Sequence, residues 1–303
     1  MSNASIRIEQ LMLPTYPEPG KEEMPLFSEH RVHQRSTGRP YPNKVTLEVN
    51  RERKIERSYT VVHLENEYLD VLVLPEIGGR IFAARDKVTD YDFFYRQHVI
   101  KPGLIGALGS WISGGVEFNW PQHHRPTTFM PLEATPKKNA DGSVTVWMGE
   151  AEPFHRMRGM VGITVYPGRS YVEAKAVVYN RTDTPLPFMW WNNLAVRVHS
   201  QYKATFPPDV AYGNDHDRRA VIPFPVMKGV YKTARPFDYG KGTDATWFSN
   251  IKLPTSVMVM RGQSQMNFLG GYDFAADAGT VTVSCHHTSV GKKMWTWGDG
   301  PFG

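Results

Sequence analysis

The chain has little cysteine: Cys285 is the single one among 303 residues. One cysteine excludes an intramolecular disulfide framework and any zinc site built from several cysteines. Such sparing use of cysteine fits a reducing compartment, so we expect a cytoplasmic protein. The residue ends an alternating segment, 280–285, whose valines predict that Cys285 faces the interior.

Long apolar runs and a strong charge excess are also missing. No stretch approaches the roughly 18 apolar residues of a membrane-spanning helix, so we expect no membrane partner. The net charge of +5 comes from 35 basic and 30 acidic residues that are spread along the chain. This pattern does not favour nucleic acid as a partner.

Sequence patterns for several common chemistries are absent. The chain has no phosphate-binding glycine loop, no dinucleotide fingerprint, no G-x-S-x-G elbow and no H-E-x-x-H pair. An oxygen-rich segment at residues 213–217 fits no EF-hand spacing. We therefore predict neither a cofactor nor a bound metal.

The chain is rich in aromatic and turn-forming residues: 8 Trp, 14 Tyr, 15 Phe, 26 Gly and 23 Pro. This composition favours β-strands joined by turns. Apolar and polar residues alternate with period two in many segments and predict strands there: 45–49, 57–64, 67–74, 144–148, 160–166, 171–180 and 280–285, with a continuously apolar strand at 257–260. The predicted fold is all-β, a large antiparallel sandwich.

No linker and no fixed-period repeat divides the chain. The first four residues look like a remnant of an expression vector, with no signal peptide after them. Residues 5–43 are rich in proline and predict an irregular arm with room for one strand. We expect a single β-sandwich domain over residues 44–303.

The densest group of reactive side chains lies at residues 111–126. Sugar sites combine aromatic rings, which stack on the apolar faces of a pyranose, with carboxylates, amides and Arg, which bind hydroxyls. Glu117, His123 and His124 are the candidates for acid–base catalysis. Asn119 and Trp120 are candidates for substrate binding. The alternative is a buried, hydrogen-bonded structural loop.

Further candidate ligand-binding residues lie in four other segments. Three of these segments also have a structural interpretation: a plain hairpin at 75–81, a core strand at 188–195 and an edge strand at 292–298. The fourth, at 237–248, is a polar loop expected at the rim of a site. The candidates are Arg80, Trp190, Asn193, Asp244, Trp247, Lys292 and Trp297.

Four of these segments together resemble a bacterial family of domains of unknown function: 75–80, 114–121 with His123-His124, 188–195 and 292–298. That family is similar in fold to galactose mutarotase, and its members often carry tetratricopeptide repeats after this domain. The resemblance covers roughly residues 40–303. It implies a β-supersandwich with an open sugar-binding cleft, in which Arg80 matches a sugar-binding arginine and His123 or His124 matches a sugar-binding histidine.

Two features depart from the mutarotase pattern. The strand that holds the general-acid histidine in mutarotases reads Met-Trp-Trp-Asn-Asn at residues 189–193, without histidine. The catalytic glutamate of mutarotases would lie beyond residue 303, so we expect a domain truncated at its C-terminus.

Three interpretations of function follow. The first is a carbohydrate-active enzyme that binds a sugar or oligosaccharide in an aromatic cleft, an aldose epimerase or a glycosidase. A glycosidase needs two carboxylates facing one cleft, and Glu117 with Asp244 is the candidate pair. The second is a non-catalytic carbohydrate-binding module of a longer repeat protein, and the third is a structural domain. The sequence does not fix the oligomeric state.

Overall fold

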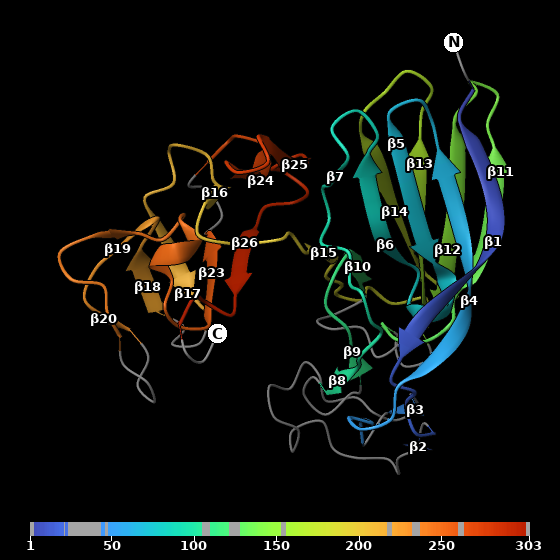
Figure 1. Cartoon of the computed structure of the whole chain (residues 1–303), viewed down its shortest axis with the longest axis horizontal. Coiled ribbons are helices and arrows are strands. Elements are labelled where there is room, and N and C mark those ends of the chain that lie inside the picture. Colours follow the sequence, from blue (N-terminus) through green and yellow to red (C-terminus); the bar gives the residue numbers. More distant parts are fainter. Residues whose placement is uncertain are drawn as a thin grey trace. The chain divides into compact units, whose positions relative to one another are not determined.

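The computed structural model describes residues 3–20, 22–23, 44–45, 48–104, 110–120, 128–152, 156–216, 220–231, 237–259 and 264–300. Within these ranges the named strands pair antiparallel and no α-helix is present (Figure 1). The predicted all-β, antiparallel architecture is confirmed. His123 and His124 lie outside the described residues.

The chain divides into two compact units, Met1–Val196 (unit 1) and Arg197–Gly303 (unit 2). Each has its own apolar core. A division at this point was not predicted from the sequence, because no change in composition marks residue 196.

Unit 1 contains a seven-stranded sheet and a four-stranded sheet. The first has the order β1-β4-β5-β6-β10-β15, and β7 also pairs with β6. Its strands are β1 (Ser5–Thr15), β4 (Ile55–Glu65), β5 (Leu69–Leu74), β6 (Arg80–Asp86), β7 (Tyr91–Asp92), β10 (Val116–Asn119) and β15 (Trp191–Leu194).

The predicted arm begins as a regular strand. All eleven residues of β1 pair with β4, from Ser5 opposite Glu65 to Thr15 opposite Ile55. Ile6 packs against the core on one face, while Leu11 and Leu13 pack on the other. Apolar side chains on both faces therefore hold β1 at the sheet edge.

The four-stranded sheet of unit 1 is a meander in the order β11-β12-β13-β14. Its strands are β11 (Glu133–Lys138), β12 (Val144–Ala151), β13 (Met157–Val165) and β14 (Val172–Asn180). Inward side chains of both sheets form the main core; they include Val62, Leu64, Val71, Val73, Phe118, Trp120, Val146, Met148, Val161 and Ile163. Predicted strands at 57–64, 67–74, 144–148, 160–166 and 171–180 are confirmed.

The other face of the seven-stranded sheet, which we call the outer face, carries a second apolar cluster. Tyr59, Leu74, Phe82, Ile112 and Phe129 are buried in this cluster. Short elements accompany the main sheets of unit 1: the 3-10 helix η2 (Pro75–Ile77) and the strand pairs β2 (Glu22–Glu23) with β3 (Lys44–Val45) and β8 (Gly103–Leu104) with β9 (Ser110–Trp111). The strand predicted at 45–49 is represented among the described residues only by β3.

Unit 2 contains two main sheets, in the orders β18-β17-β23-β26 and β16-β24-β25. Their strands are β16 (Tyr202–Thr205), β17 (Tyr212–Asp215), β18 (Ala220–Pro223), β23 (Thr255–Val259), β24 (Phe268–Asp273), β25 (Ala278–Val283) and β26 (Lys292–Thr296). Smaller elements are β19 (Val226–Met227), β20 (Val230–Tyr231), β21 (Phe237–Asp238), β22 (Thr243–Asp244) and the 3-10 helix η3 (Phe248–Asn250).

The orientation predicted for β25 is wrong. Val281 and Val283 are 63% and 71% exposed rather than inward. β25 is an edge strand of a three-stranded sheet, and its partly covered side chains are Ala278, Thr280 and Thr282. Alternation identified the strand, but not which face is covered.

Cys285 is likewise exposed, because it lies beyond the end of β25. Hydrogen bonds from the backbone and then the side chain of His287 lower the pKa of its thiol. An exposed thiol with a lowered pKa is more reactive than the buried one that the sequence predicted.

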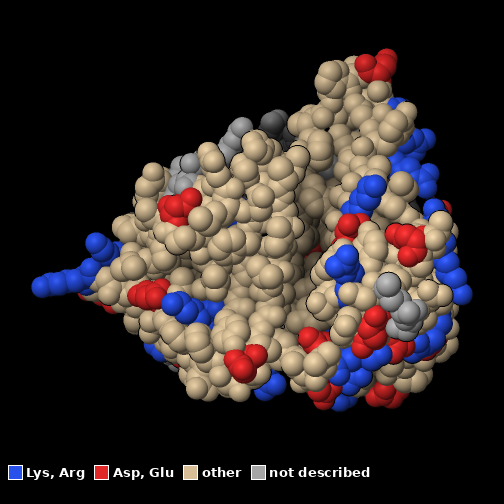
Figure 2. Space-filling model, turned by 90° about the horizontal axis from the view of Figure 1, so that it is seen from above, with Lys and Arg blue, Asp and Glu red and all other residues tan. Residues whose placement is uncertain are grey.

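Basic and acidic side chains are interspersed on the face of the molecule seen in Figure 2. Among the described residues, no helix is both long and apolar enough to cross a membrane.

Candidate functional site

The pleat of β10 and of the residue after it divides their side chains between the two faces of the sheet. Phe118 and Trp120 enter the main core, and Glu117 points to the outer face with Asn193, its partner on β15. Asn193 Nδ2 donates to Glu117 Oε1 over 2.9 Å. Two predicted site residues are thus brought together by strand register.

Arg80, at the start of β6, joins this pair. Its Nη2 lies 3.8 Å from Glu117 Oε2, and its Nη1 donates to the carbonyl oxygens of Ile112 (3.0 Å) and Gly114 (3.3 Å). We call Arg80, Glu117 and Asn193 the buried polar cluster. Arg80 is 1% exposed and Glu117 4% exposed, so both charges are almost completely withdrawn from water.

Gly115 allows the backbone to approach the cluster. Its φ is +63°, and a Cβ at this position would lie 1.9 Å from the carbonyl oxygen of Ile81. The glycine therefore allows the backbone before β10 to lie close to β6, where the carbonyl oxygens of Ile112 and Gly114 accept from Arg80. Arg80, Glu117 and Asn119 have almost no exposed surface, so a ligand would not reach their side chains in this arrangement.

Trp120 and Trp190 pack together instead of facing solvent. Trp120 is 0% exposed, and its ring stacks on that of Trp190 with centroids 5.5 Å apart and planes at 7°. A buried ring cannot stack on a sugar. The structural interpretation of these two residues, core packing, agrees with their placement.

The remaining predicted site residues belong to unit 2. Asp244 accepts hydrogen bonds from the backbone and hydroxyl of Thr246. Trp247 stacks on Phe274 with centroids 5.3 Å apart, and Lys203 Nζ lies 5.3 Å from the Trp247 ring. Lys292 pairs with Val259 on the core side of β26. Asp244 and Trp247 have local partners that already orient their side chains.

Trp297 is different, because it is 55% exposed beside Trp295, which is 45% exposed. The two rings meet edge to face with centroids 4.7 Å apart. Trp295 pairs with Ser256, and Lys293 pairs with Met258, which in turn pairs with Asn214. The side chains on this face of the four-stranded sheet of unit 2 define the Trp face: Tyr212, Asn214, Val221, Ser256, Met258, Lys293, Trp295 and Trp297.

Lys292, the lysine predicted for this site, lies on the core side of β26, whereas Lys293 lies on the Trp face. Lys293 and Trp295 are two residues apart on one strand, so their side chains share a face. This spacing could have identified Lys293 from the sequence. None of the strand residues on the described Trp face is acidic. Ser256 Oγ lies 3.4 Å from Nδ1 of His216.

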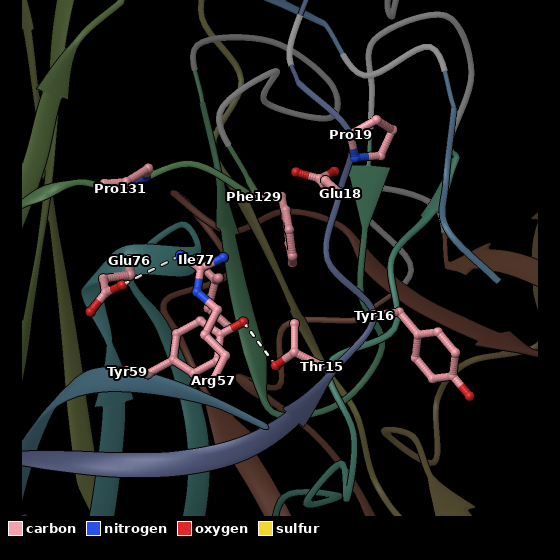
Figure 3. Close-up of a pocket in the computed structure, with 10 residues that line it drawn as sticks. All are labelled: Thr15, Tyr16, Glu18, Pro19, Arg57, Tyr59, Glu76, Ile77, Phe129 and Pro131. Carbon is pink, nitrogen blue, oxygen red and sulfur yellow. Dashed lines mark hydrogen bonds and ion pairs between the residues drawn. The ribbon is translucent and has the colours of Figure 1, made fainter. Parts of the chain in front are cut away.

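A pocket of about 220 Å³ on unit 1 was missed from the sequence (Figure 3). Its ten lining residues come from β1, β4, η2 and the segments next to them: Thr15, Tyr16, Glu18, Pro19, Arg57, Tyr59, Glu76, Ile77, Phe129 and Pro131. Figure 3 shows the Tyr16 ring pointing away from the other side chains. No contiguous motif joins these residues, so no sequence signal could have grouped them.

The groups inside this pocket are paired with each other. The Arg57 guanidinium lies 4.9 Å from the Tyr59 ring centroid, and its Nη2 is 3.8 Å from Glu76 Oε2. The Tyr59 hydroxyl is 3.1 Å from Thr15 Oγ1, and burial raises the pKa of Tyr59. Thr15, Arg57, Tyr59 and Glu76 are thus already engaged with one another in this pocket.

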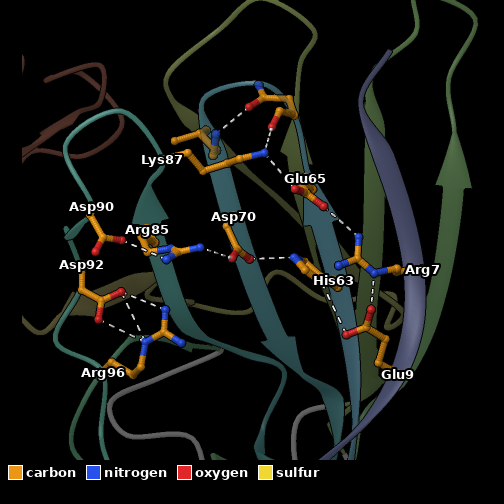
Figure 4. Close-up of polar contacts among 12 residues, drawn as sticks. Arg7, Glu9, His63, Glu65, Asp70, Arg85, Lys87, Asp90, Asp92 and Arg96 are labelled. Carbon is orange, nitrogen blue, oxygen red and sulfur yellow. Dashed lines mark hydrogen bonds and ion pairs between the residues drawn. The ribbon is translucent and has the colours of Figure 1, made fainter. Parts of the chain in front are cut away.

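A network of charged side chains runs across β1, β4, β5 and β6 (Figure 4). His63 lies between Asp70 and Glu9, with nitrogen–oxygen distances of 2.6 and 3.5 Å. Glu65 accepts hydrogen bonds from Lys87 Nζ and Arg7 Nη1, each over 2.8 Å. These bonds, first from Lys87 and then from Arg7, lower the pKa of Glu65 to about 2.

The depressed pKa of Glu65 predicts a pH-dependent contribution to stability. The contribution is fully present above the ordinary pKa of 4.5 and is lost as the pH falls through about 2. Glu65→Gln is expected to lower the free energy of unfolding by about 1 kcal/mol at pH 7, since the side chain is partly exposed and its charges are screened. Urea unfolding from pH 7 to pH 3 should show the difference shrinking below pH 4.5; a constant difference would contradict the assignment.

Within the described ranges, no group of three or more His, Cys, Asp or Glu side chains is placed to hold a metal ion.

Comparison with known proteins supports the fold and gives the family. A solved TPR-domain containing protein from Parabacteroides distasonis matches with a TM-score of 0.77 at 20% sequence identity. The match covers 99% of this chain and 47% of that protein, so the chain spans about half the length of this relative. The family described as "Domain of unknown function (DUF5107)" matches residues 39–301, across both compact units, and the chain belongs to that family.

Proposed function

We propose that this domain binds a carbohydrate on the Trp face of unit 2 and does so without catalysing a reaction. The observation that supports the proposal is the pair of exposed indole rings of Trp295 and Trp297, whose centroids are 4.7 Å apart.

The chemistry of the Trp face fits a sugar ligand. Exposed indoles leave apolar area in water that a ligand would cover, and the C–H face of a pyranose suits an aromatic surface. Two polar groups lie on the same face, the Lys293 ammonium and the Asn214 amide. A strand within a hydrogen-bonded sheet holds Trp295 in place before the ligand arrives.

Binding without turnover is favoured over the two enzymatic interpretations. Acid–base catalysis needs an acid and a base that reach the substrate. The strand residues of the described Trp face include no carboxylate, and Glu117 is buried beside Arg80 and Asn193. Glu117 and Asp244, the candidate glycosidase pair, belong to different units. In a longer protein with TPR repeats, such a domain would supply the sugar specificity.

The proposal is tested by titrating the full chain with a panel of neutral and acidic oligosaccharides while following tryptophan fluorescence and binding heat. Trp295→Ala and Trp297→Ala are each expected to weaken binding by about tenfold or more, because each removes one stacking surface. Thermal unfolding of each variant reports whether the fold is intact.

Tyr179→Ala is the matched control, since Tyr179 is an aromatic residue that is 66% exposed but lies on β14 of unit 1. It should leave the affinity unchanged. Equal weakening by all three substitutions, or a bound sugar unaffected by both tryptophan changes, would refute the Trp face as the binding site.

A further inference from the structure

An open hollow of about 390 Å³ lies on unit 1, beside the end of β12, the start of β13 and the residue that follows β14. Its described lining is polar apart from one methyl group and consists of Ala151, Glu152, Arg156 and Arg181. Glu152 is 4% exposed and anchors the connection, since its backbone N–H donates to the carbonyl of Met157 over 2.8 Å.

The charges around this hollow do not cancel. Among the described lining residues, two are arginines and one is a glutamate, which gives a formal excess of one positive charge. Among the described residues, neither Arg156 nor Arg181 has a carboxylate oxygen within 4.0 Å. In contrast, Arg158, two residues along β13, lies 3.9 Å from Glu133. The two arginines of the hollow therefore keep donors available for a ligand.

The backbone at Arg156 supports a functional role. Three described non-glycine residues have positive φ angles: Asp90, Asp277 and Arg156, the last with φ of +59°. Aspartate tolerates this region, because its short side chain bonds to the nearby backbone. An arginine does not have that advantage, and residues in unfavourable conformations concentrate at functional sites.

We propose that this hollow binds an oxyanion, a phosphate or carboxylate group carried by a small ligand, between Arg156 and Arg181. The planar guanidinium presents paired N–H donors that match two oxygens of such a group, and charge assistance strengthens these bonds. The hollow is open, which leaves room for the rest of a ligand beyond the oxyanion. This inference does not depend on carbohydrate binding at the Trp face, because it concerns other residues in the other unit.

Inorganic phosphate is the first probe, titrated into the full chain at constant ionic strength and followed by calorimetry or NMR. Arg181→Ala and Arg156→Gly are each expected to raise the Kd by about tenfold. Glycine is chosen at position 156 because it accepts the positive φ and removes the guanidinium without adding strain. Glu152→Gln is expected to lower the Kd, since it removes the negative charge that faces the anion.

Arg158→Ala is the control. It also removes one positive charge close to the hollow, but Arg158 lies beside Glu133 and does not line the hollow. It should change the Kd less than about twofold if the bonds are local, whereas a general electrostatic effect would make all three arginine variants alike. That outcome, or the absence of saturable phosphate binding to a folded wild-type chain along with the absence of saturable acetate binding, would overturn the proposal. Saturable acetate binding in the same experiment, without phosphate binding, would assign the site to carboxylates.

Discussion

Replacing Arg80 by leucine is expected to lower the free energy of unfolding by about 3–5 kcal/mol, because the substitution leaves the buried Glu117 carboxylate without its guanidinium partner. Glu117 is 4% exposed and its Oε2 is 3.8 Å from Arg80 Nη2. Arg80 also caps two carbonyl oxygens of the 112–115 segment, and leucine cannot donate to them. Urea unfolding of the full chain at pH 7 measures the change.

The double substitution Arg80→Leu with Glu117→Leu separates the charge effect from the packing effect. Buried ion pairs are replaced by apolar residues at little net loss when both charges leave together. The double variant should therefore be more stable than the sum of the two single changes predicts, with a coupling of about 1–3 kcal/mol. Strict additivity would mean that Arg80 and Glu117 contribute to stability independently. Arg80→Lys keeps the charge without the fork of donors and should fall between wild type and Arg80→Leu.

The strand assignments were predictable wherever alternation and turn residues agreed. The hairpin of β12 and β13 and the following strand β14 match their predicted ranges closely. β1 was harder, because Pro14 and the proline-rich residues after it suggested an irregular arm. All eleven residues of β1 pair with β4, which lies far along the sequence. No local pattern within β1 predicts that pairing.

The candidate site was predictable in its members but not in their surroundings. Arg80, Glu117 and Asn193 were selected one by one, and strand register brings them together. Sequence alone could not show that Arg80 and Glu117 are almost completely buried, since burial depends on packing between distant segments. Exposure was equally unpredictable for β26. Residues two apart share a face, which puts Trp295 and Trp297 together, but only the structure identifies that face as exposed.

The packing of Trp120 depends on an absent side chain on the neighbouring sheet. Gly159 on β13 faces the core, and a Cβ at this position would lie 2.1 Å from Trp120 Nε1 and 2.4 Å from two further indole atoms. The indole therefore lies between the Gly159 backbone and the ring of Trp190. A large ring and a glycine on facing strands form one packing unit, which explains why a glycine is present within β13.

Gly159→Ala is accordingly expected to lower the free energy of unfolding by about 2–3 kcal/mol, because the added methyl group overpacks a fully buried ring. The sign of this change distinguishes overpacking from an ordinary glycine-to-alanine effect, since such a change at an unstrained position leaves the free energy of unfolding unchanged or raises it slightly. Gly20→Ala supplies that comparison, because a Cβ added at Gly20 would have no atom within 4 Å. Chemical unfolding measures both variants.

Trp120→Phe tests the cause of the loss at Gly159. Phenylalanine is smaller and makes room for the new methyl group, although the change alone lowers stability by about 1–3 kcal/mol through lost packing. If overpacking is the cause, Gly159→Ala should destabilise the Trp120→Phe protein much less than it destabilises wild type. An equal loss in both backgrounds would show instead that β13 requires glycine for its own backbone, and that the indole merely lies beside it.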